Sequence, residues 1–217
     1  MRREKRERGA GNGWPRIALK LAVIFAALAW VGSCAQLAYP QGIVRAALPA
    51  AAPLPLGTYY SPDTNLEALD VAAVTSAAKT ISLAAFSLSD QALIDALADR
   101  ARHGVVVMIY LDRGELQAQC RGDATCARSP LHELINLNSV EIRVKRSKVL
   151  MHLKSYAVDG ALERDGSANF SEQGEERQDN SAVFTGDPGT VSGFSRKFQA
   201  MWTRPDNLTV AQAITTP

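Results

Sequence analysis

One short stretch of the chain holds several side chains that bind phosphate, at spacings that let them meet. His152 and Lys154 are two residues apart, so on an extended segment both side chains point to the same side. Gly166-Ser167 forms a tight turn that presents backbone N–H groups and a hydroxyl to an anion, and Asn169 adds an amide donor. An imidazole, an ammonium, a hydroxyl and an amide that converge on one spot make a phosphate site without a metal.

A run of cations lies just before this stretch: Arg143, Lys145, Arg146 and Lys148. The whole chain has 24 Lys and Arg against 22 Asp and Glu, but the first 34 residues hold seven of the bases and two of the acids. Residues 35–217 therefore carry 17 bases and 20 acids, a net charge of −3. This balance excludes a generally basic protein that coats nucleic acid, so any anion site is local. The run either steers an anionic substrate or is an exposed strand end.

The spacing matches a known motif. His152-x-Lys154, four residues, Asp159, six residues and then Gly166-Ser167-x-Asn169 resembles the HxKxxxxD(x)6GSxN motif of the phospholipase D superfamily. Six residues agree in type and spacing. The order of expected elements from Thr58 to about Trp202 is similar to that of the short, single-motif bacterial endonucleases of the superfamily, of the Nuc type.

The resemblance implies a role for each matching residue. His152 is the expected nucleophile, and Lys154 and Asn169 are expected to hold the non-bridging phosphate oxygens and stabilise the pentacoordinate state. Ser167 assists through its hydroxyl or backbone. Asp159 supports the local fold. Asp179 stands where relatives usually carry a Glu that orients the histidine.

The family mechanism needs two imidazoles, one that attacks phosphorus and one that protonates the leaving oxygen. Long members carry two motifs in one chain, whereas short members dimerise and share one site. This chain has one motif, so the resemblance implies a homodimer in which two copies of His152 face each other. No cofactor and no metal is implied.

Ordinary structural explanations stand beside these roles. A histidine and a lysine two residues apart are commonly a surface pair, and the Gly-Ser-x-Asn that follows is what favours catalysis here. His103 and His132 are expected at a helix end and in a short helix, in structural or exposed positions. Three further acids are expected in a solvated loop: Glu172, Glu175 and Glu176.

Strands and helices alternate along the body of the chain. Hydrophobic residues make up 47% and charged residues 21%, an ordinary globular balance. The patterns predict an α/β fold, a single phospholipase D-like domain with a mixed sheet and helices on both faces. The expected strands lie near residues 57–61, 81–88, 105–111, 140–144, 155–159 and 181–184. The expected helices lie near residues 63–78, 89–102, 131–137 and 193–202.

The N-terminus has the order of a secretory signal. A basic segment precedes an uncharged apolar run of eleven residues, 21–31, which is short beside the roughly 20 residues of a membrane-spanning helix. Val31-Gly32-Ser33-Cys34 loosely resembles a lipobox, so lipidation at Cys34, ordinary signal cleavage and an uncleaved anchor are all open. Each of the three outcomes places the body in the bacterial cell envelope, on the periplasmic side of the inner membrane, in the periplasm or secreted.

The expected organisation is a signal or anchor over 1–34, an Ala/Pro-rich linker over 35–56, a catalytic domain over 57–204 and a frayed tail over 205–217. Cys120 and Cys126 lie six residues apart in a polar loop. In an oxidising compartment such a pair closes a disulfide, although free thiols or, less favourably, a metal site would also fit the spacing.

The motif indicates a phosphodiester but does not name it. The first hypothesis is a metal-independent nuclease that contacts the backbone phosphates of DNA or RNA with little sequence preference. The alternatives are a phospholipase D that hydrolyses lipid headgroups, and a non-catalytic binding protein anchored in the envelope.

Overall fold

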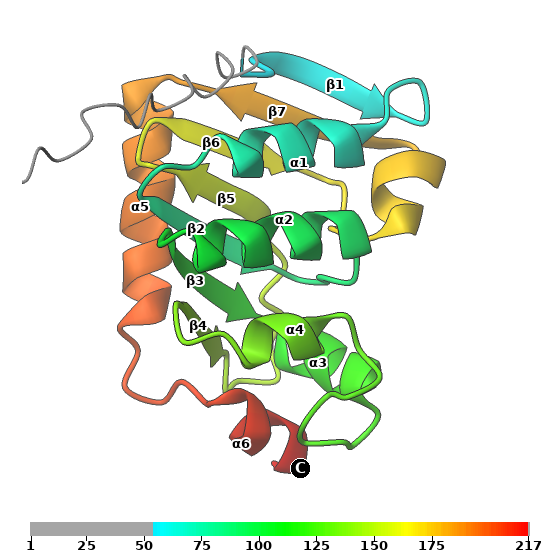
Figure 1. Cartoon of the computed structure of the whole chain (residues 1–217), viewed down its shortest axis with the longest axis vertical. Helices are drawn as coiled ribbons and strands as arrows, with labels where there is room; N and C mark the ends of the chain where they lie inside the picture. Colours follow the sequence, from blue (N-terminus) through cyan, green and yellow to red (C-terminus); the bar gives the residue numbers. More distant parts are fainter. Residues whose placement is uncertain (1–53, 217) are drawn as a thin grey trace, which may run out of the picture. The chain divides into compact units, whose positions relative to one another are not determined.

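A computed structural model describes residues 54–216, and these fold around one seven-stranded sheet with the order β1-β7-β6-β5-β2-β3-β4 (Figure 1). Its strands are β1 (Gly57–Ser61), β2 (Thr80–Ala85), β3 (Val106–Leu111), β4 (Val140–Val144), β5 (Lys154–Val158), β6 (Leu162–Gly166) and β7 (Asn180–Thr185). β2, β3 and β4 are parallel, and β5 joins them antiparallel to β2. β6, β7 and β1 continue the sheet in antiparallel steps, so the sheet is mixed.

This topology gathers many chain ends at one edge of the sheet, which we call the site edge. The carboxyl ends of β1, β2, β3, β4 and β6 lie there, together with the amino ends of β5 and β7. Loops that follow or precede these strands are therefore neighbours although they are far apart in sequence. Ligands of open α/β sheets bind outside such an edge.

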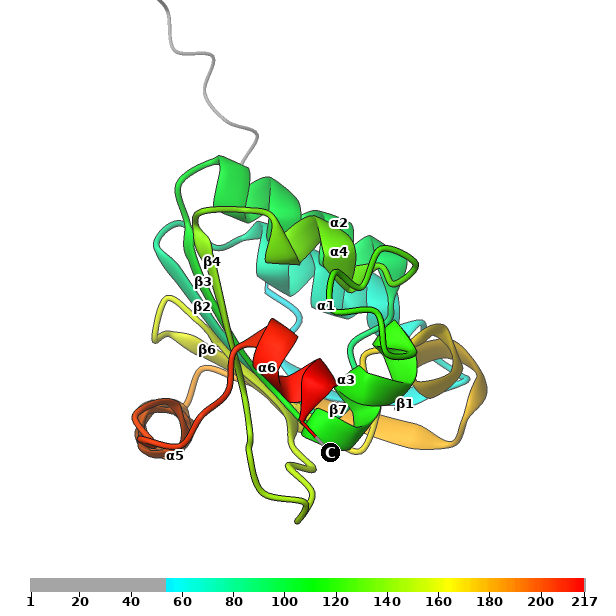
Figure 2. The ribbon, with the colours of Figure 1, turned by 90° about the horizontal axis from the view of Figure 1, so that it is seen from below.

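Helices cover both faces of the sheet (Figure 2). They are α1 (Leu66–Thr75), α2 (Gln91–Arg102), α3 (Arg113–Cys120), α4 (Leu131–Ile135), α5 (Pro188–Trp202) and α6 (Val210–Thr215), with a short π-helical turn η1 (Gln173–Arg177). α5 lies on one face, where Phe194, Phe198 and Trp202 pack on the sheet. The other five helices cover the opposite face and share the larger apolar core. The predicted α/β architecture is thus confirmed.

Local signals explain where the longer helices begin. Asp90 caps α2, because its carboxylate accepts a 2.8 Å hydrogen bond from the backbone N–H of Leu93. The apolar stripe of α2 is buried as its spacing predicts. Asp187 caps α5 in the same way, and Pro188 occupies the first turn, so this helix begins five residues before the expected start at Gly193.

Four elements were not expected from the sequence. β6 runs through Glu163-Arg164-Asp165, whose charges conceal a strand; Arg164 is nevertheless fully buried. α3 begins directly after β3, where Asp112 caps it, and η1 follows Asn169. The fourth element is α6.

The prediction of a frayed tail after Pro205 is wrong. Leu208 exchanges two 2.9 Å backbone hydrogen bonds with Val144. Gln117 of α3 donates to the carbonyl oxygen of Ala213 in α6 at 2.8 Å. The fold therefore extends to the last residues that the structure describes, because the buried side of α6 completes the core.

The expected signal, the lipobox cysteine Cys34 and nearly all of the linker lie outside the described residues. Within residues 54–216, none of the helices combines the length and the apolar character that crossing a bilayer requires. A disulfide joins Cys120, the last residue of α3, to Cys126 in the loop that leads to α4.

Candidate active site

His152 lies at the site edge, in the loop that enters β5. Its side chain is exposed, and the imidazole packs on the ring of Phe86 with 4.5 Å between the ring centroids. Phe86 directly follows β2. An imidazole held on one side by an aromatic ring and open to solvent on the other is available to react with a bound phosphodiester.

Lys154 is the first residue of β5, and only 5% of its surface is exposed. Its Nζ donates a 2.9 Å hydrogen bond to the carbonyl oxygen of His152 and lies 4.7 Å from the centre of the Phe86 ring. Burial lowers the pKa of this ammonium and nearby Arg164 lowers it further, whereas Glu115 acts in the opposite direction. Phe86 thus contacts both the imidazole and the ammonium, and the hydrogen bond joins the ammonium to the backbone of His152.

The backbone on both sides of His152 is fixed by neighbouring strand ends. Asp112, which follows β3, accepts a 2.8 Å hydrogen bond from the N–H of Met151. Phe86 donates its own N–H to the carbonyl oxygen of Leu153 at 2.8 Å. Because these bonds come from two different strands, the loop that carries the histidine has little freedom to move away from the site edge.

The Gly166-Ser167 turn is built by close contact with β7. A Cβ added at Gly166 would lie 2.1 Å from the carbonyl oxygen of Ser181, so only glycine fits. The hydroxyl of Ser167 donates to Oδ1 of Asn180 at 2.9 Å and accepts from the N–H of Ser181 at 2.9 Å. The Ser167 hydroxyl therefore connects β6 to β7 in this structure.

Asn169 is half-buried at the end of the same segment. Its Oδ1 is buried and has no hydrogen-bond partner among residues 54–216. Gly174 of η1 packs on the Asn169 backbone, where an added Cβ would lie 2.5 Å from its carbonyl oxygen. η1 therefore fixes the position of Asn169 through a contact that only glycine allows.

A buried arginine links the two halves of the motif. Nη1 of Arg164 donates to the carbonyl oxygen of Lys154 at 2.7 Å and to that of Ala168 at 3.2 Å. Nη2 of the same side chain lies 3.1 Å from a carboxylate oxygen of Asp70, and both side chains are fully buried. The Lys154 strand and the Gly-Ser-x-Asn segment are thus held by one guanidinium.

Glu175 completes this buried cluster, which corrects its expected place in a solvated loop. Its side chain is fully buried beside Asp70, and burial together with that neighbour raises its pKa to about 11. At neutral pH Glu175 is therefore protonated. The sequence did not reveal this because η1 turns the residue inward while Glu172 remains exposed.

The structure does not bring Asp159 and Asp179 into contact with His152. Asp159 lies beyond the other end of β5, where its carboxylate accepts hydrogen bonds from the N–H groups of Ala78, Lys79 and Thr80 at 2.7–2.8 Å. Partial burial raises its pKa, but these backbone bonds outweigh it and the net shift is downward. Asp179 is exposed and lines a pocket that also contains Ser167.

Comparisons with known proteins show the family of this chain. A family described as "Cardiolipin synthase, PLD-like domain" matches residues 71–202, which is more than half of the chain. The chain belongs to the phospholipase D superfamily. Members of this superfamily are phosphodiester hydrolases, so the family sets the class of chemistry.

Relatives of the phospholipase D superfamily with solved structures share the fold. Nuc from Salmonella typhimurium, a phospholipase D family member, superposes with a TM-score of 0.57 at 24% identity, over 70% of this chain and 96% of Nuc. NucT from Helicobacter pylori gives a TM-score of 0.58 at 19% identity, over 67% of this chain and 93% of NucT. The fold is that of the short Nuc-type members.

A mitochondrial cardiolipin hydrolase from Chlamydomonas reinhardtii is 23% identical over 127 residues. The match covers 58% of this chain and 53% of that protein, so the chain spans about half the length of this curated relative.

The basic run is largely engaged within the phospholipase D fold. Arg143 is paired with Glu141 and donates to the carbonyl oxygen of Trp202. Lys145 and Arg146 donate to the carbonyl oxygens of Leu150 and Asp206, respectively. Lys148 is exposed and has no side-chain partner in the described part of the chain. The run therefore shapes the loop before His152 as well as adding positive charge to it.

The mechanism that the family resemblance implies uses a second imidazole, and this chain does not place one beside His152. The sequence has three histidines. His103 ends α2 at the opposite edge of the sheet, where its Nδ1 is hydrogen-bonded to the carbonyl oxygen of Asp99. His132 is the second residue of α4, and its Nδ1 is hydrogen-bonded to the carbonyl oxygen of Thr125.

Four residues that position this site were missed from the sequence alone: Phe86, Asp112, Arg164 and Gly174. Phe86 and Asp112 lie at the ends of strands that the sequence did predict, so the meeting of parallel strand ends at one edge was a usable signal. Arg164 and Gly174 gave no such signal, because Arg164 is charged and is paired with the sequence-distant Asp70, and the contact of Gly174 with Asn169 depends on the π-helical turn η1.

Proposed function

We propose that the chain is a metal-independent phosphodiesterase of the nuclease type, which cleaves DNA or RNA through a phosphohistidine intermediate. The observation that supports this most is the exposed imidazole of His152 beside the buried ammonium of Lys154, at the edge where the Gly-Ser-x-Asn segment ends. Near-complete coverage of the short chain Nuc supports the same assignment.

In the proposed first step, a ring nitrogen of neutral His152 forms a bond to phosphorus as the bond between phosphorus and the leaving oxygen breaks. The protonated imidazole of the partner subunit's His152 gives its proton to that oxygen. In the second step the same partner imidazole takes a proton from water, the water oxygen bonds to phosphorus and the histidine–phosphorus bond breaks. Lys154 and Asn169 stabilise the charge on the equatorial oxygens in both steps.

Homodimerisation is part of this proposal. One chain supplies one imidazole to the site edge, whereas the two-step displacement uses two imidazoles. A two-fold axis near His152 would supply the second without any further residue type. The two large apolar side chains just before His152 favour a contact there, because Val149 is 72% exposed and Leu150 is 56% exposed.

The N-terminal pattern supports a place in the bacterial cell envelope. A basic segment followed by an apolar run is an export signal, and Cys34 is the residue that lipidation would use. We propose that the catalytic domain acts on the periplasmic side of the inner membrane. It is either attached to the membrane by a lipid or an N-terminal anchor, or released after signal cleavage.

Phospholipid headgroup hydrolysis is the second candidate. The cardiolipin hydrolase relative and the exposed Val149-Leu150 beside the site favour it. A non-catalytic binding role is the third, and the presence of both His152 and Lys154 weighs against it.

Nicking of supercoiled plasmid by the purified chain in EDTA tests the proposal. We expect nicking that His152→Ala reduces by roughly three orders of magnitude or more. His103→Ala, at the opposite sheet edge, is the matched control and should nick normally. Full nicking by His152→Ala would contradict the nucleophile assignment. Release of choline from phosphatidylcholine vesicles, without any nicking, would favour the phospholipase instead.

A further inference from the structure

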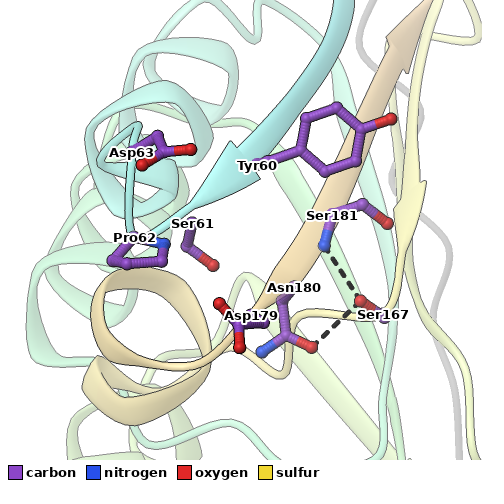
Figure 3. Close-up of a pocket in the computed structure, with 8 residues that line it drawn as sticks. All are labelled: Tyr60, Ser61, Pro62, Asp63, Ser167, Asp179, Asn180 and Ser181. Atoms are coloured by element: carbon purple, nitrogen blue, oxygen red, sulfur yellow. Dashed lines mark hydrogen bonds between the residues drawn. The ribbon is translucent and has the colours of Figure 1, made fainter.

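A pocket of about 490 Å³ opens at the site edge beside the Gly-Ser-x-Asn segment (Figure 3). It lies where the end of β1 and the start of β7 meet the segment that follows β6. Its lining residues are Tyr60, Ser61, Pro62, Asp63, Ser167, Asp179, Asn180 and Ser181. Ser167 belongs to the catalytic motif, so the pocket and the proposed phosphate site share a wall.

Three of the lining side chains are engaged in building the walls. The hydroxyl of Ser61 donates to the carbonyl oxygen of Gln178 at 2.8 Å. Ser167 is bonded to Asn180, and Nδ2 of Asn180 donates to the carbonyl oxygen of Gly174 at 2.9 Å. These bonds connect β1, β6, β7 and η1, so the pocket has a shape that is fixed before any ligand binds.

Three other lining groups are available to a ligand. The ring of Tyr60 is 59% exposed, and the carboxylates of Asp63 and Asp179 are exposed. No hydrogen bond or ion pair joins any of these three side chains to another among residues 54–216. Figure 3 shows the Tyr60 ring at one side of the pocket and the two carboxylates at the other. Carboxylates in the lining repel a phosphate, and together with an aromatic ring they suit a planar group that carries amino hydrogens.

The distance from Lys154 to Tyr60 decides which substrates reach the aromatic side of this pocket. β5, β6, β7 and β1 are successive neighbours, and Tyr60 is paired with Ser181 at about the level of Lys154. Three strand spacings amount to about 14 Å. The headgroup of a phospholipid, such as choline, is a two-carbon arm and is too short to span this distance. A polynucleotide whose scissile phosphate lies at His152 places a base there a few nucleotides away.

We propose that this pocket is a nucleobase subsite, in which Tyr60 stacks on an unpaired base and Asp63 and Asp179 accept hydrogen bonds from its amino group. The proposal rests on the nuclease function proposed above and adds to it a single-stranded substrate and a base preference. Cytosine, adenine and guanine carry an exocyclic amino group. Thymine and uracil lack this amino group, and the carbonyl oxygens on both sides of their single N3–H donor are repelled by the carboxylates.

The test compares an oligonucleotide with a substrate too small to reach the pocket. We would measure kcat/KM of the full chain for oligo-dC, for oligo-dT and for bis(p-nitrophenyl) phosphate. In Tyr60→Ala, the ratio of the oligo-dC value to the small-substrate value should fall about ten-fold, the size of one base-stacking interaction. Tyr60→Phe keeps the ring and should keep the ratio. Asp63→Asn should reduce the preference for oligo-dC over oligo-dT.

The possible outcomes separate this inference from the nuclease proposal. If the wild-type chain cleaves oligonucleotides and Tyr60→Ala keeps the same ratio, the subsite is wrong and the nuclease proposal stands. If the wild-type chain hydrolyses bis(p-nitrophenyl) phosphate but no oligonucleotide, the nuclease proposal fails and the subsite fails with it. Equal rates on oligo-dC and oligo-dT in the wild type would overturn the role of the carboxylates.

Discussion

At the scale of single residues, Lys154 shows how burial and reactivity are connected. Its ammonium is largely buried and contacts the ring of Phe86 and the carbonyl oxygen of His152. Burial lowers its pKa, so Lys154 loses its charge at a lower pH than an exposed lysine. Since the proposed role of Lys154 requires the charged form, the alkaline limit of activity should report its pKa.

Glu115→Gln tests this link. Glu115 is the neighbour that raises the pKa of Lys154, so its neutralisation should lower that pKa further. The alkaline limb of the kcat/KM profile should then move to lower pH. Glu141→Gln, at an exposed residue paired with Arg143, is the control and should leave the limb in place. A limb unmoved by Glu115→Gln would show that another group sets it.

Gly166→Ala tests the close approach of β6 and β7. The added Cβ would lie 2.1 Å from the carbonyl oxygen of Ser181, so the two strands must separate. We expect the free energy of unfolding to fall by about 1–3 kcal/mol. Gly193→Ala is the control, since its Cβ meets nothing within 4 Å on helix α5, and there the helix should gain up to about 1 kcal/mol. Urea denaturation measures both, and equal changes in the two variants would contradict the account.

At the scale of elements, the site depends on strand ends held by a buried ionic cluster. Arg164 on β6 joins the carbonyl oxygens of Lys154 and Ala168 and is paired with Asp70 on α1. Tyr156 on β5 donates a 2.8 Å hydrogen bond to the same carboxylate. Burying charges is costly, so the cluster contributes to the specificity of the arrangement more surely than to net stability.

Arg164→Met is expected to destabilise the fold strongly. It leaves two carbonyl oxygens and the buried carboxylate of Asp70 without their partner, a change that typically costs about 3–5 kcal/mol. Arg100→Met, which removes the partly exposed pair with Asp99, should cost about 0–1 kcal/mol. A loss for Arg164→Met no larger than that for Arg100→Met, measured by chemical denaturation, would mean that the cluster does not hold β5 and β6 together.

At the scale of the whole molecule, the sequence predicted the sheet architecture better than it predicted the supporting elements. Val106–Leu111 is a continuous apolar run, and α2 has a cap and a regular apolar stripe, so their periodicity was sufficient. β6 was missed because Glu163, Arg164 and Asp165 are consecutive charged residues, and Arg164 is buried through its pair with Asp70, which is distant in sequence. α6 was missed because its six residues give too short a pattern.

The candidate site shows the same division. His152, Lys154 and the Gly-Ser-x-Asn segment were found from spacing within one stretch of chain, and the structure places them at one edge of the sheet. Phe86 and Asp112 come from other strands and appear only once the strand order is known. Asp159 lies outside the site because it follows the last residue of β5, whereas Lys154 is the first residue of that strand.

The central claim is that each active site uses His152 from two copies of the chain. Mixing wild type with His152→Ala at equal amounts, under conditions that exchange subunits, tests it most directly. If both imidazoles are needed, only dimers of two wild-type chains nick plasmid, and the mixture should retain about a quarter of the activity of wild type alone at the same total protein concentration. Retention of one half, which independent sites would give, would contradict the account.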